Sequence, residues 1–550
     1  MDLRREGYAL QTQGRLAEAI ACYEQVVAQD PGDWEIWNNL GNARRAAGDR
    51  GGAIEALIQA SLVRPDLAAI HYNLGVSLAE AGRLEEAVRA FGDAVRLGPD
   101  HPPALLDLGR ALRLLGRHGE ALPPLARAAQ LAPGAPDIQL ERGRAYSGLG
   151  RFDEADEAYR QALALQPGLA AAFLERGLLL ERGNRLDRLP ALLDEAAEQG
   201  VCDLPYLRAL ALERDGKLDE ALVEAQAATD DPARRALLVG RLADKAGDVA
   251  TAFEAYAEMN RLAGQGSQAN AKAYRAHVAA LGEMLTPAYA AAWSKAEPAR
   301  GRPAPVFLVG FPRSGTTLLD TLLMGHPRVH VLEEEPILQR VGEGLGDFAR
   351  LPSLGLDEAN RLRALYFAEL DAFDPAARGK TVVDKLPLNI LGAPLIHRLF
   401  PEAKLIFAKR HPCDVVLSCF MQNFDLNDAM ANFLDLGDAA RLYDLVLAFW
   451  TRARAILPLD VHEVRYEALV ENKEAEMRAL TGFLGLPWDE RVLDHQGTAL
   501  RRGPIVTPSY AQVAQPIYRR AAGRWQRYRD QLAPVLPILA PWAELMGYET

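Results

Sequence analysis

A glycine-rich loop follows a short apolar segment near the middle of the chain and carries residues suited to binding an anion. The segment 306–309 reads VFLV and the loop 310–317 reads GFPRSGTT. The apolar run is typical of a strand buried on both faces, and the residues after the loop have helical spacing. A strand, a loop and a helix in that order direct backbone N–H groups at a phosphate. We therefore expect a phosphate site here, with Arg313 as a fixed positive group.

The spacing of this loop is similar to that of the nucleotide-triphosphate loop, with one difference. Thr316 stands where that loop has a lysine that serves the β- and γ-phosphates. A triphosphate, and with it an ATP-dependent kinase, is therefore disfavoured. A glycine turn in an unrelated α/β domain would explain the loop if it stood alone.

A second segment with an apolar strand, a basic residue and a helix lies about a hundred residues after the loop. The segment AKLIFAKRHPCDVVLSCF has an apolar strand at 405–407, then Arg410, then Ser418. Further strands are predicted at 381–383 and 461–464, and a helix at 438–456. Strands that alternate with helices indicate a parallel sheet with helices on both faces, and the ligand is expected across the carboxyl ends of the strands.

Both motifs resemble the sulfotransferase family, over roughly residues 303–530. In that family PRSGTT is the 5′-phosphosulfate loop, and the arginine and serine of the second segment hold the 3′-phosphate. The resemblance implies 3′-phosphoadenosine 5′-phosphosulfate (PAPS) as co-substrate and 3′,5′-ADP as product, without a metal. The residues that it implies for the co-substrate are Arg313, Ser314, Gly315, Thr316, Thr317, Arg410, Ser418, Tyr466 and Arg524. Gln422 departs from the pattern, because the family has a further basic residue there.

The segments HPRVHVLEEEPIL, VVDKLPLNI and TPSYAQ are most similar to tyrosylprotein sulfotransferases. This resemblance implies Glu334 as the base that takes the acceptor proton, and Lys385 and Arg313 as groups that stabilise charge on the phosphosulfate. It implies that Ser509 helps to stabilise the transition state. Alternatively, the glutamates form a solvated acidic turn, Lys385 is a surface residue at a strand end, and the arginines around 519–529 are a basic helix face.

The first half of the chain repeats with a period of 34 residues, which fits helix–turn–helix units. Four sets of residues follow this period: Gly14, Gly48, Gly82, Gly116 and Gly150; Ala19, Ala53, Ala87, Ala121 and Ala155; Pro31, Pro65, Pro99, Pro133 and Pro167; Gly41, Gly75, Gly109, Gly143 and Gly177. The glycines of the first set suit a left-handed turn that ends a helix. The alanines allow two helices to pack closely, and the prolines end the second helix of each unit. The pattern resembles the tetratricopeptide repeat and predicts an all-α superhelix.

We predict three regions: about eight repeat units over 1–264, a helical linker over 265–302 with a helix near 271–294, and a P-loop-like α/β sulfotransferase domain over 303–550. The concave surface of such an array usually holds peptides or proteins. A protein or peptide acceptor is therefore the expected partner. A structural spacer or a dimerisation arm explains the same pattern, so a homo-oligomer stays an alternative.

Composition narrows the class of protein. The 550 residues carry a net charge of −12, which argues against a nucleic-acid binder. Four cysteines without metal-ligand spacing suit a reducing compartment, and no window resembles a secretory signal or a transmembrane span. We expect a cytoplasmic protein.

The sequence thus predicts a sulfotransferase that modifies a hydroxyl, most simply a tyrosine in a protein or peptide. A carbohydrate or small-molecule hydroxyl is the alternative acceptor. A repeat scaffold with a nucleotide-sensing domain is the alternative from a different class of protein.

Overall fold

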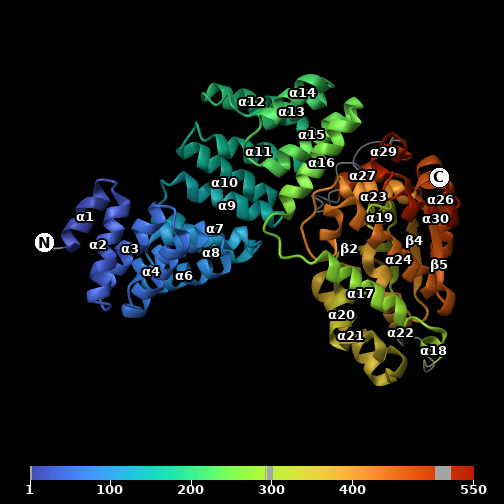
Figure 1. Cartoon of the computed structure of the whole chain (residues 1–550). Helices are drawn as coiled ribbons and strands as arrows, with labels where there is room; N and C mark the ends of the chain where they lie inside the picture. Colours follow the sequence, from blue (N-terminus) through green and yellow to red (C-terminus); the bar gives the residue numbers. More distant parts are fainter. Residues whose placement is uncertain (1–2, 292, 294–301, 502–521, 550) are drawn as a thin grey trace. The chain divides into compact units, whose positions relative to one another are not determined.

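The computed structural model describes residues 3–291, 293, 302–501 and 522–549, and these form two compact units, 1–207 and 208–550 (Figure 1). The boundary falls within helix α13 (Pro205–Arg214). The second unit therefore contains the last helical repeats together with the whole sheet.

Residues 3–264 form eight consecutive helix pairs, as the 34-residue period predicts. The pairs are α1 (Leu3–Thr12) and α2 (Leu16–Gln29), α3 (Trp34–Ala46) and α4 (Arg50–Val63), α5 (Ala68–Glu80) and α6 (Leu84–Leu97), α7 (Pro102–Leu114) and α8 (His118–Leu131), α9 (Pro136–Gly148) and α10 (Phe152–Leu165), α11 (Ala170–Arg182) and α12 (Leu189–Glu198), α13 and α14 (Leu218–Ala227), and α15 (Pro232–Ala246) and α16 (Val249–Gly264). A short 3₁₀ turn, η1 (Leu186–Arg188), precedes α12.

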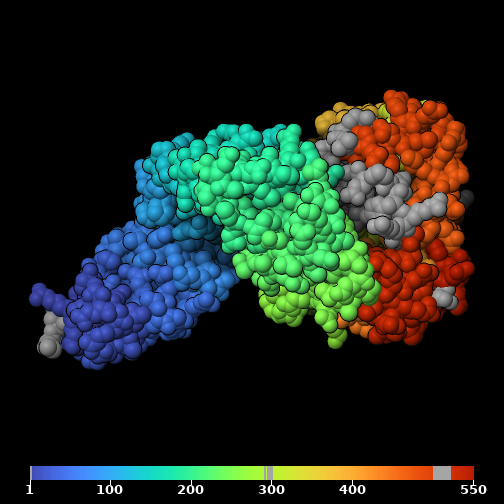
Figure 2. Space-filling model, turned by 90° about the horizontal axis from the view of Figure 1, so that it is seen from above, coloured from blue at the N-terminus to red at the C-terminus, as the bar shows by residue number. Residues whose placement is uncertain are grey.

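The periodic residues have the structural uses that their types predict. The first glycine set has positive φ, between 71° and 86°, just after the first helix of each pair. The five periodic alanines are completely buried. At the second glycine set a Cβ would lie only 2.3–2.5 Å from a side chain of the following helices. These small residues let the helices of the first unit pack into the continuous surface seen in blue to teal in Figure 2.

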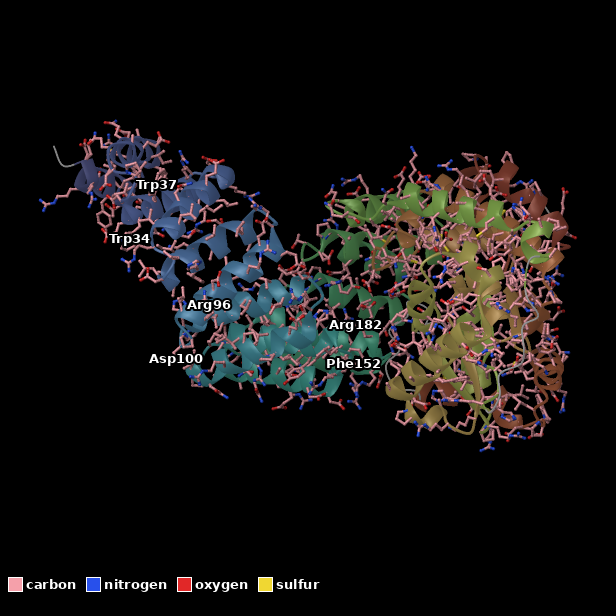
Figure 3. The ribbon with its side chains drawn as sticks, turned by 90° about the horizontal axis from the view of Figure 1, so that it is seen from below. Trp34, Trp37, Arg96, Asp100, Phe152 and Arg182 are labelled. Carbon is pink, nitrogen blue, oxygen red and sulfur yellow. The ribbon has the colours of Figure 1, made fainter. Side chains whose placement is uncertain are left out.

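The prolines stand two residues after the second helix of each pair, where they start the connection to the next pair. Trp37, which Figure 3 labels on α3, holds one such connection, because its Nε1 donates a hydrogen bond to the Pro31 carbonyl at 2.9 Å. Arg64 after α4 lies over the ring of Trp34 at 5.6 Å. The connections are therefore fixed by side chains of the neighbouring helices.

The remaining elements begin with two linking helices and continue as alternating strands and helices. They are α17 (Ala271–Met284), α18 (Pro287–Ala291), β1 (Val306–Gly310), α19 (Thr316–Met324), β2 (Val329–Glu333), α20 (Ile337–Leu345), η2 (Phe348–Ser353), α21 (Leu356–Phe373), η3 (Pro375–Ala377), β3 (Thr381–Lys385), η4 (Pro387–Gly392), α22 (Ala393–Leu399), β4 (Lys404–Lys409), α23 (Pro412–Phe420), η5 (Met430–Leu434), α24 (Leu436–Ile456), β5 (Asp460–Arg465), α25 (Tyr466–Glu471), α26 (Lys473–Leu484), η6 (Glu490–Leu493), α27 (His495–Arg501), η8 (Arg524–Tyr528), α29 (Arg529–Leu532) and α30 (Leu536–Leu545).

The five strands form one parallel sheet with the order β2-β3-β1-β4-β5. This confirms the predicted parallel sheet. From β1 the chain goes to β2 and β3 on one side, and then crosses back to β4 and β5 on the other. In open parallel sheets, ligands bind beyond the carboxyl ends of the strands where the order reverses, here next to β1.

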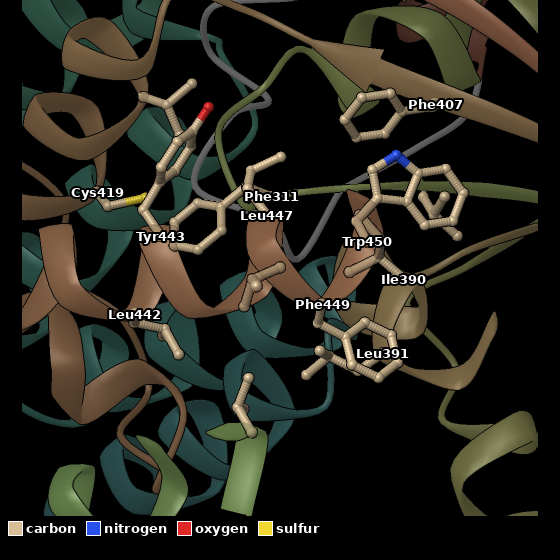
Figure 4. Packing of buried hydrophobic residues seen from close by; sticks show 14 of the residues in the cluster. Phe311, Ile390, Leu391, Phe407, Cys419, Leu442, Tyr443, Leu447, Phe449 and Trp450 are labelled. Atoms are coloured by element: carbon tan, nitrogen blue, oxygen red, sulfur yellow. The ribbon is translucent and has the colours of Figure 1, made fainter. Parts of the chain in front are cut away.

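Helices cover both faces of the sheet, as the alternating pattern predicts. Val306 and Leu308 of β1 pack in one cluster with α19 and α26, whereas Phe307 and Val309 pack in the other with α21, α22 and α24. In the second cluster Phe407 of β4 meets Trp450 of α24 with ring centroids 5.2 Å apart (Figure 4). Because the central strands β3, β1 and β4 are buried on both sides, the sheet is a rigid base for the loops at its carboxyl end.

The last repeat pair packs directly on the α/β core of the second unit. Phe253 of α16 stacks on Phe420 of α23 with centroids 5.0 Å apart, and the buried Asn260 Nδ2 donates to the Phe420 carbonyl at 2.8 Å. In the described part of the chain, no helix combines the length and the apolar character needed to cross a membrane.

Candidate active site

The loop between β1 and α19 has a backbone that only some residues tolerate. Gly315 has φ 101° at the start of α19 and Arg313 has φ 68°. A Cβ on Gly315 would lie 2.6 Å from the Tyr466 ring, and one on Gly310 would lie 2.7 Å from the Ala408 carbonyl oxygen. The glycines therefore let the loop approach β4 and the residue after β5 closely.

Hydroxyl groups line the loop and the first turn of α19. Ser314, Thr316 and Thr317 are all buried. The Oγ of Ser314 has no hydrogen-bond partner among the described residues. A buried hydroxyl without a partner is costly, and an anion at the N-terminus of α19 would satisfy it.

The two predicted anion motifs are in direct contact. Arg313 Nε donates to Ser418 Oγ at 3.1 Å, and Arg410 Nη1 donates to the Arg313 carbonyl at 3.2 Å. The Arg410 guanidinium also lies over the Tyr466 ring, 4.8 Å from its centroid. The structure thus brings together Arg313, Ser418, Arg410 and Tyr466, as predicted residues of one site.

Lys385 and the predicted base Glu334 meet at the ends of β3 and β2. Lys385 Nζ donates to Glu334 Oε1 at 2.8 Å and to Glu333 Oε1 at 3.3 Å, and lies 3.1 Å from Asp320 Oδ2. The Lys385 side chain is fully buried, whereas 40% of the Glu334 side chain is exposed. Lys385 is therefore a buried ammonium rather than a surface residue at a strand end.

The backbone of Glu334 is also unusual. Its φ is 52°, and in the described part of the chain only Asn184, Arg313 and Glu334 have positive φ among non-glycine residues. The Glu334 N–H donates to the Lys385 carbonyl at 2.8 Å, which fixes this turn to the end of β3. Such conformations are concentrated at functional sites, and the role of Glu334 stays a prediction.

The electrostatics around β3 differ between its two faces. Burial lowers the pKa of Lys385, but the carboxylates of Asp320, Glu334 and Glu333 outweigh burial, so its pKa is raised overall. On the opposite face, burial raises the pKa of Asp384 to about 7, although the hydroxyl of Tyr366 donates to it at 2.7 Å. Lys385 therefore stays charged at neutral pH.

The predicted residues lie at the carboxyl ends of all five strands. Arg313 follows β1, Glu334 follows β2, Lys385 ends β3, Arg410 follows β4, and Tyr466 follows β5. This is the edge where a parallel sheet binds its ligand. The positions are those that the sequence predicts; their roles stay predictions.

Arg524 is held by an acidic residue that the sequence analysis did not consider. Its Nη2 lies 2.9 Å from Asp244 Oδ2 on α15, and Arg527 and Tyr528 contact the same carboxylate. The adjacent Trp525 N–H donates to Asp414 on α23 at 2.8 Å. Arg524 thus lies near the helix of Ser418 but is paired with Asp244. Ser509 lies outside the described residues.

Asp320, Asp414 and Asp244 are functional candidates that sequence reasoning missed. Asp320 is the single charged residue of α19, and Asp414 is the first-turn acid of α23. A lone acidic residue in a short helix with no other charge is a sequence signal that could have found both. Asp244 has no such signal, because its partners are about 280 residues away in the sequence.

Comparison with known proteins assigns families to the two parts of the chain. Residues 305–490 match the model of the sulfotransferase family, and residues 4–66, 39–102, 72–136 and 136–169 match tetratricopeptide repeat models.

An uncharacterized protein of Aquifex aeolicus is 31% identical over 323 residues, which are 54% of this chain and 40% of the relative. Protein-tyrosine sulfotransferase A of Caenorhabditis elegans is 26% identical over 261 residues, 44% of this chain and 67% of the relative. Among solved structures, a crystal structure of MamA is 27% identical, and the match covers 29% of this chain and 94% of that chain with a TM-score of 0.29.

The chain spans less than half of the Aquifex relative and about two thirds of the Caenorhabditis one. The family-model matches show that the chain carries tetratricopeptide repeats at its N-terminus and a domain of the sulfotransferase family at its C-terminus.

Proposed function

We propose that the chain transfers a sulfuryl group from PAPS to an acceptor hydroxyl, and that the acceptor is a tyrosine in a protein or peptide. The observation that carries this proposal is the hydrogen bond from Arg313 to Ser418, because it joins the two anion motifs into one site. PAPS has a 5′-phosphosulfate and a 3′-phosphate and needs both motifs. The similarity to a protein-tyrosine sulfotransferase supports tyrosine as the acceptor.

The residues present fit such a ligand. The buried Ser314 hydroxyl, which has no hydrogen-bond partner among the described residues, fits a phosphosulfate oxygen at the N-terminus of α19. Arg410, stacked on Tyr466, supplies a buried positive charge beside Ser418 for the 3′-phosphate. The net charge of the chain is −12, so attraction of this anion depends on such local groups.

In this proposal Glu334 accepts the proton of the acceptor hydroxyl, since its side chain is the most exposed of the carboxylates at Lys385. PAPS supplies a sulfuryl group whose sulfur exchanges its bond to the bridging phosphate oxygen for a bond to the acceptor oxygen. Lys385 and Arg313 stabilise the charge that remains on the phosphate as 3′,5′-ADP departs. Each of these groups follows or ends a strand of the sheet.

We further propose that the repeats bind the protein acceptor. The proposal is supported by a row of polar contacts between the first helices of successive repeats. These contacts are Asn73 Nδ2 to Asn38 Oδ1 at 2.8 Å, Tyr72 OH to Asp107 Oδ2 at 3.1 Å, Arg110 Nε to Glu141 Oε1 at 3.4 Å, and Arg144 Nε to Glu175 Oε1 at 2.7 Å. These contacts fix the first helices relative to one another, and repeat arrays use the extended surface that such helices form to bind partners.

Ligand-dependent stability tests the proposed co-substrate. PAPS and 3′,5′-ADP are expected to stabilise the full chain, by about 2.7 kcal/mol at 100 times Kd, and ATP far less. An equal effect of ATP contradicts a PAPS site. A panel of tyrosine peptides, oligosaccharides and small phenols, each with PAPS, then identifies the acceptor; sulfation of sugars or phenols alone contradicts the tyrosine proposal.

A further inference from the structure

Asp320 is a buried carboxylate behind the lysine of the candidate site. It lies in the second turn of α19, is fully buried, and its Oδ2 is 3.1 Å from Lys385 Nζ. The single hydroxyl proton of Thr321 is shared between the other carboxylate oxygen of Asp320, 3.1 Å from Oγ1, and the Thr317 carbonyl oxygen, 2.8 Å from Oγ1. The carboxylate is therefore held in place by its own helix.

The other two carboxylates at Lys385 are placed differently. The side chains of Glu333 and Glu334 are 22% and 40% exposed, and they sit at the end of β2 and in the turn after it. If Glu334 is the base, its carboxylate becomes neutral when it accepts the proton of the acceptor hydroxyl. Lys385 then loses its nearest counter-charge, at 2.8 Å, while it remains buried.

A buried ammonium without a counter-charge gives up its proton or moves, because the low-dielectric interior disfavours the charged form. The groups that face Lys385 are Asp320 from α19, Glu333 from β2 and Glu334 from the following turn. Asp384, the preceding residue of β3, is instead hydrogen-bonded by Tyr366 and Asn389. Asp320 is thus the fully buried counter-charge of Lys385.

We propose that Asp320 is a positioning residue that keeps Lys385 charged and in place when Glu334 takes the acceptor proton and becomes neutral. The proposal rests on the proposed function only in the roles of Glu334 and Lys385. The statement that the Asp320 carboxylate keeps Lys385 protonated does not depend on sulfuryl transfer. Two separate measurements can therefore test the two parts.

The first measurement is the titration of Lys385 in the full chain by NMR of ¹³Cε-labelled lysine. The chain has nine lysines, and the signal of Lys385 is identified by its loss in Lys385→Arg. Asp320→Asn is expected to move the titration midpoint down by about 1–3 pH units, because a close opposite charge is lost. Glu334→Gln is expected to move it less, and the matched control Asp384→Asn to leave it near that of the wild type.

A midpoint that moves at least as far in Glu334→Gln as in Asp320→Asn overturns the proposal. If Asp320→Asn does not fold, the double variant Glu333→Gln/Glu334→Gln tests the proposal instead. In that variant Asp320 is the one carboxylate that remains of the three at Lys385. Lys385 is expected to stay charged at pH 7 in that variant. A neutral Lys385 there overturns the proposal.

The second measurement is the pH dependence of kcat with PAPS and a tyrosine peptide. In Asp320→Asn the alkaline limb is expected to move to lower pH by about 1–3 units, as Lys385 loses its proton earlier. In Lys385→Arg the added Asp320→Asn change is expected to leave that limb in place, because arginine stays charged.

A purely structural role would lower kcat in both backgrounds without this difference, and that result overturns the positioning role. A shifted Lys385 titration in a chain that never turns over PAPS leaves Asp320 as the counter-charge and contradicts the proposed function instead.

Discussion

Arg313 Nε donates a hydrogen bond to Ser418 Oγ at 3.1 Å, although the two residues are 105 positions apart in the sequence. Arg313 belongs to the loop after β1 and Ser418 to the helix after β4, and the two strands are neighbours in the sheet. The bond helps to hold Arg313 in its left-handed conformation, φ 68°. Two sequence motifs therefore form one site through adjacent strand ends.

Loss of the Arg410 side chain should weaken binding of 3′,5′-ADP. We expect Arg410→Ala to raise Kd about 10–100-fold, since a buried, charge-assisted contact is worth about 1.5–3 kcal/mol. Titration calorimetry measures this. Lys409→Ala is the matched control, because Lys409 is paired with Glu463 on β5. Equal affinities of the Arg410 variant and the control would place the 3′-phosphate elsewhere.

Glu334→Gln should leave co-substrate binding intact and slow the chemical step. Removal of a general base usually lowers kcat by about 10²–10⁴-fold. Steady-state rates with PAPS and a peptide acceptor, beside the Kd of 3′,5′-ADP, separate the two effects. Glu335→Gln, at the neighbouring position, is the control. If Glu334→Gln turned over as fast as this control, another group would be the base.

Glu141 should be a main stabilising residue of the repeats. Its side chain is 3% exposed and lies 2.8 Å from Arg113, 2.9 Å from Arg144 and 3.4 Å from Arg110. Loss of one partner from a buried ion pair costs about 3–5 kcal/mol, so Glu141→Gln is expected to lower the free energy of unfolding by about that much. Glu154→Gln, whose pair with Arg151 lies on the surface, is the control and is expected to lower the free energy of unfolding far less.

The same carboxylate gives this stabilisation a pH dependence. Burial raises the pKa of Glu141, but Arg113, Arg144 and Arg110 outweigh burial, so the folded pKa lies below the ordinary 4.5. A lowered pKa stabilises the folded state above the unfolded pKa, and the gain is lost as pH falls through the folded value. Chemical unfolding at a series of pH values from 7 down to well below 4.5 should show the difference between the wild type and Glu141→Gln shrinking only below pH 4.5. A constant difference would contradict the ion-pair account.

Truncations should separate the repeats that support the catalytic region from those that do not. A chain that begins at Ala271 lacks α16, whose Asn260 is bonded to the carbonyl of Phe420 just after Ser418. We expect it to be less stable and to bind 3′,5′-ADP more weakly than a chain that begins at Pro205. Thermal unfolding gives the Tm of the two chains, and calorimetry gives their Kd for 3′,5′-ADP. Equal values in the two chains would mean that α15 and α16 act only as a spacer.

Local sequence patterns predicted a large part of the fold. The periodic glycines, alanines and prolines each act within one helix pair or its immediate neighbour, so the sequence alone indicates the repeats. The loop at Gly310–Thr317 likewise needs only a strand, a turn and a helix in order. Because parallel strands end at one edge, the predicted Arg410 and Lys385 come to the same edge as this loop.

Contacts between distant segments could not be predicted. The pairing of Arg524 with Asp244 joins η8 to a repeat helix, and no local pattern encodes such a partner. The 3.1 Å contact between Asp320 and Lys385 likewise joins α19 to β3, and no local pattern encodes it. The predicted boundary at 264 came from the repeat period, whereas the packing of α16 on α23 places the last repeats in the same unit as the sheet.

Transfer of labelled sulfur tests the central claim most directly. The full chain is incubated with ³⁵S-labelled PAPS and a tyrosine-containing peptide, and the labelled peptide and 3′,5′-ADP are both quantified. We predict that the two products form in equal amounts, and that Glu334→Gln forms about 10²–10⁴-fold less of each per unit time. Tight binding of PAPS without label on any tyrosine, sugar or phenol acceptor would contradict a sulfotransferase and leave a nucleotide-sensing scaffold.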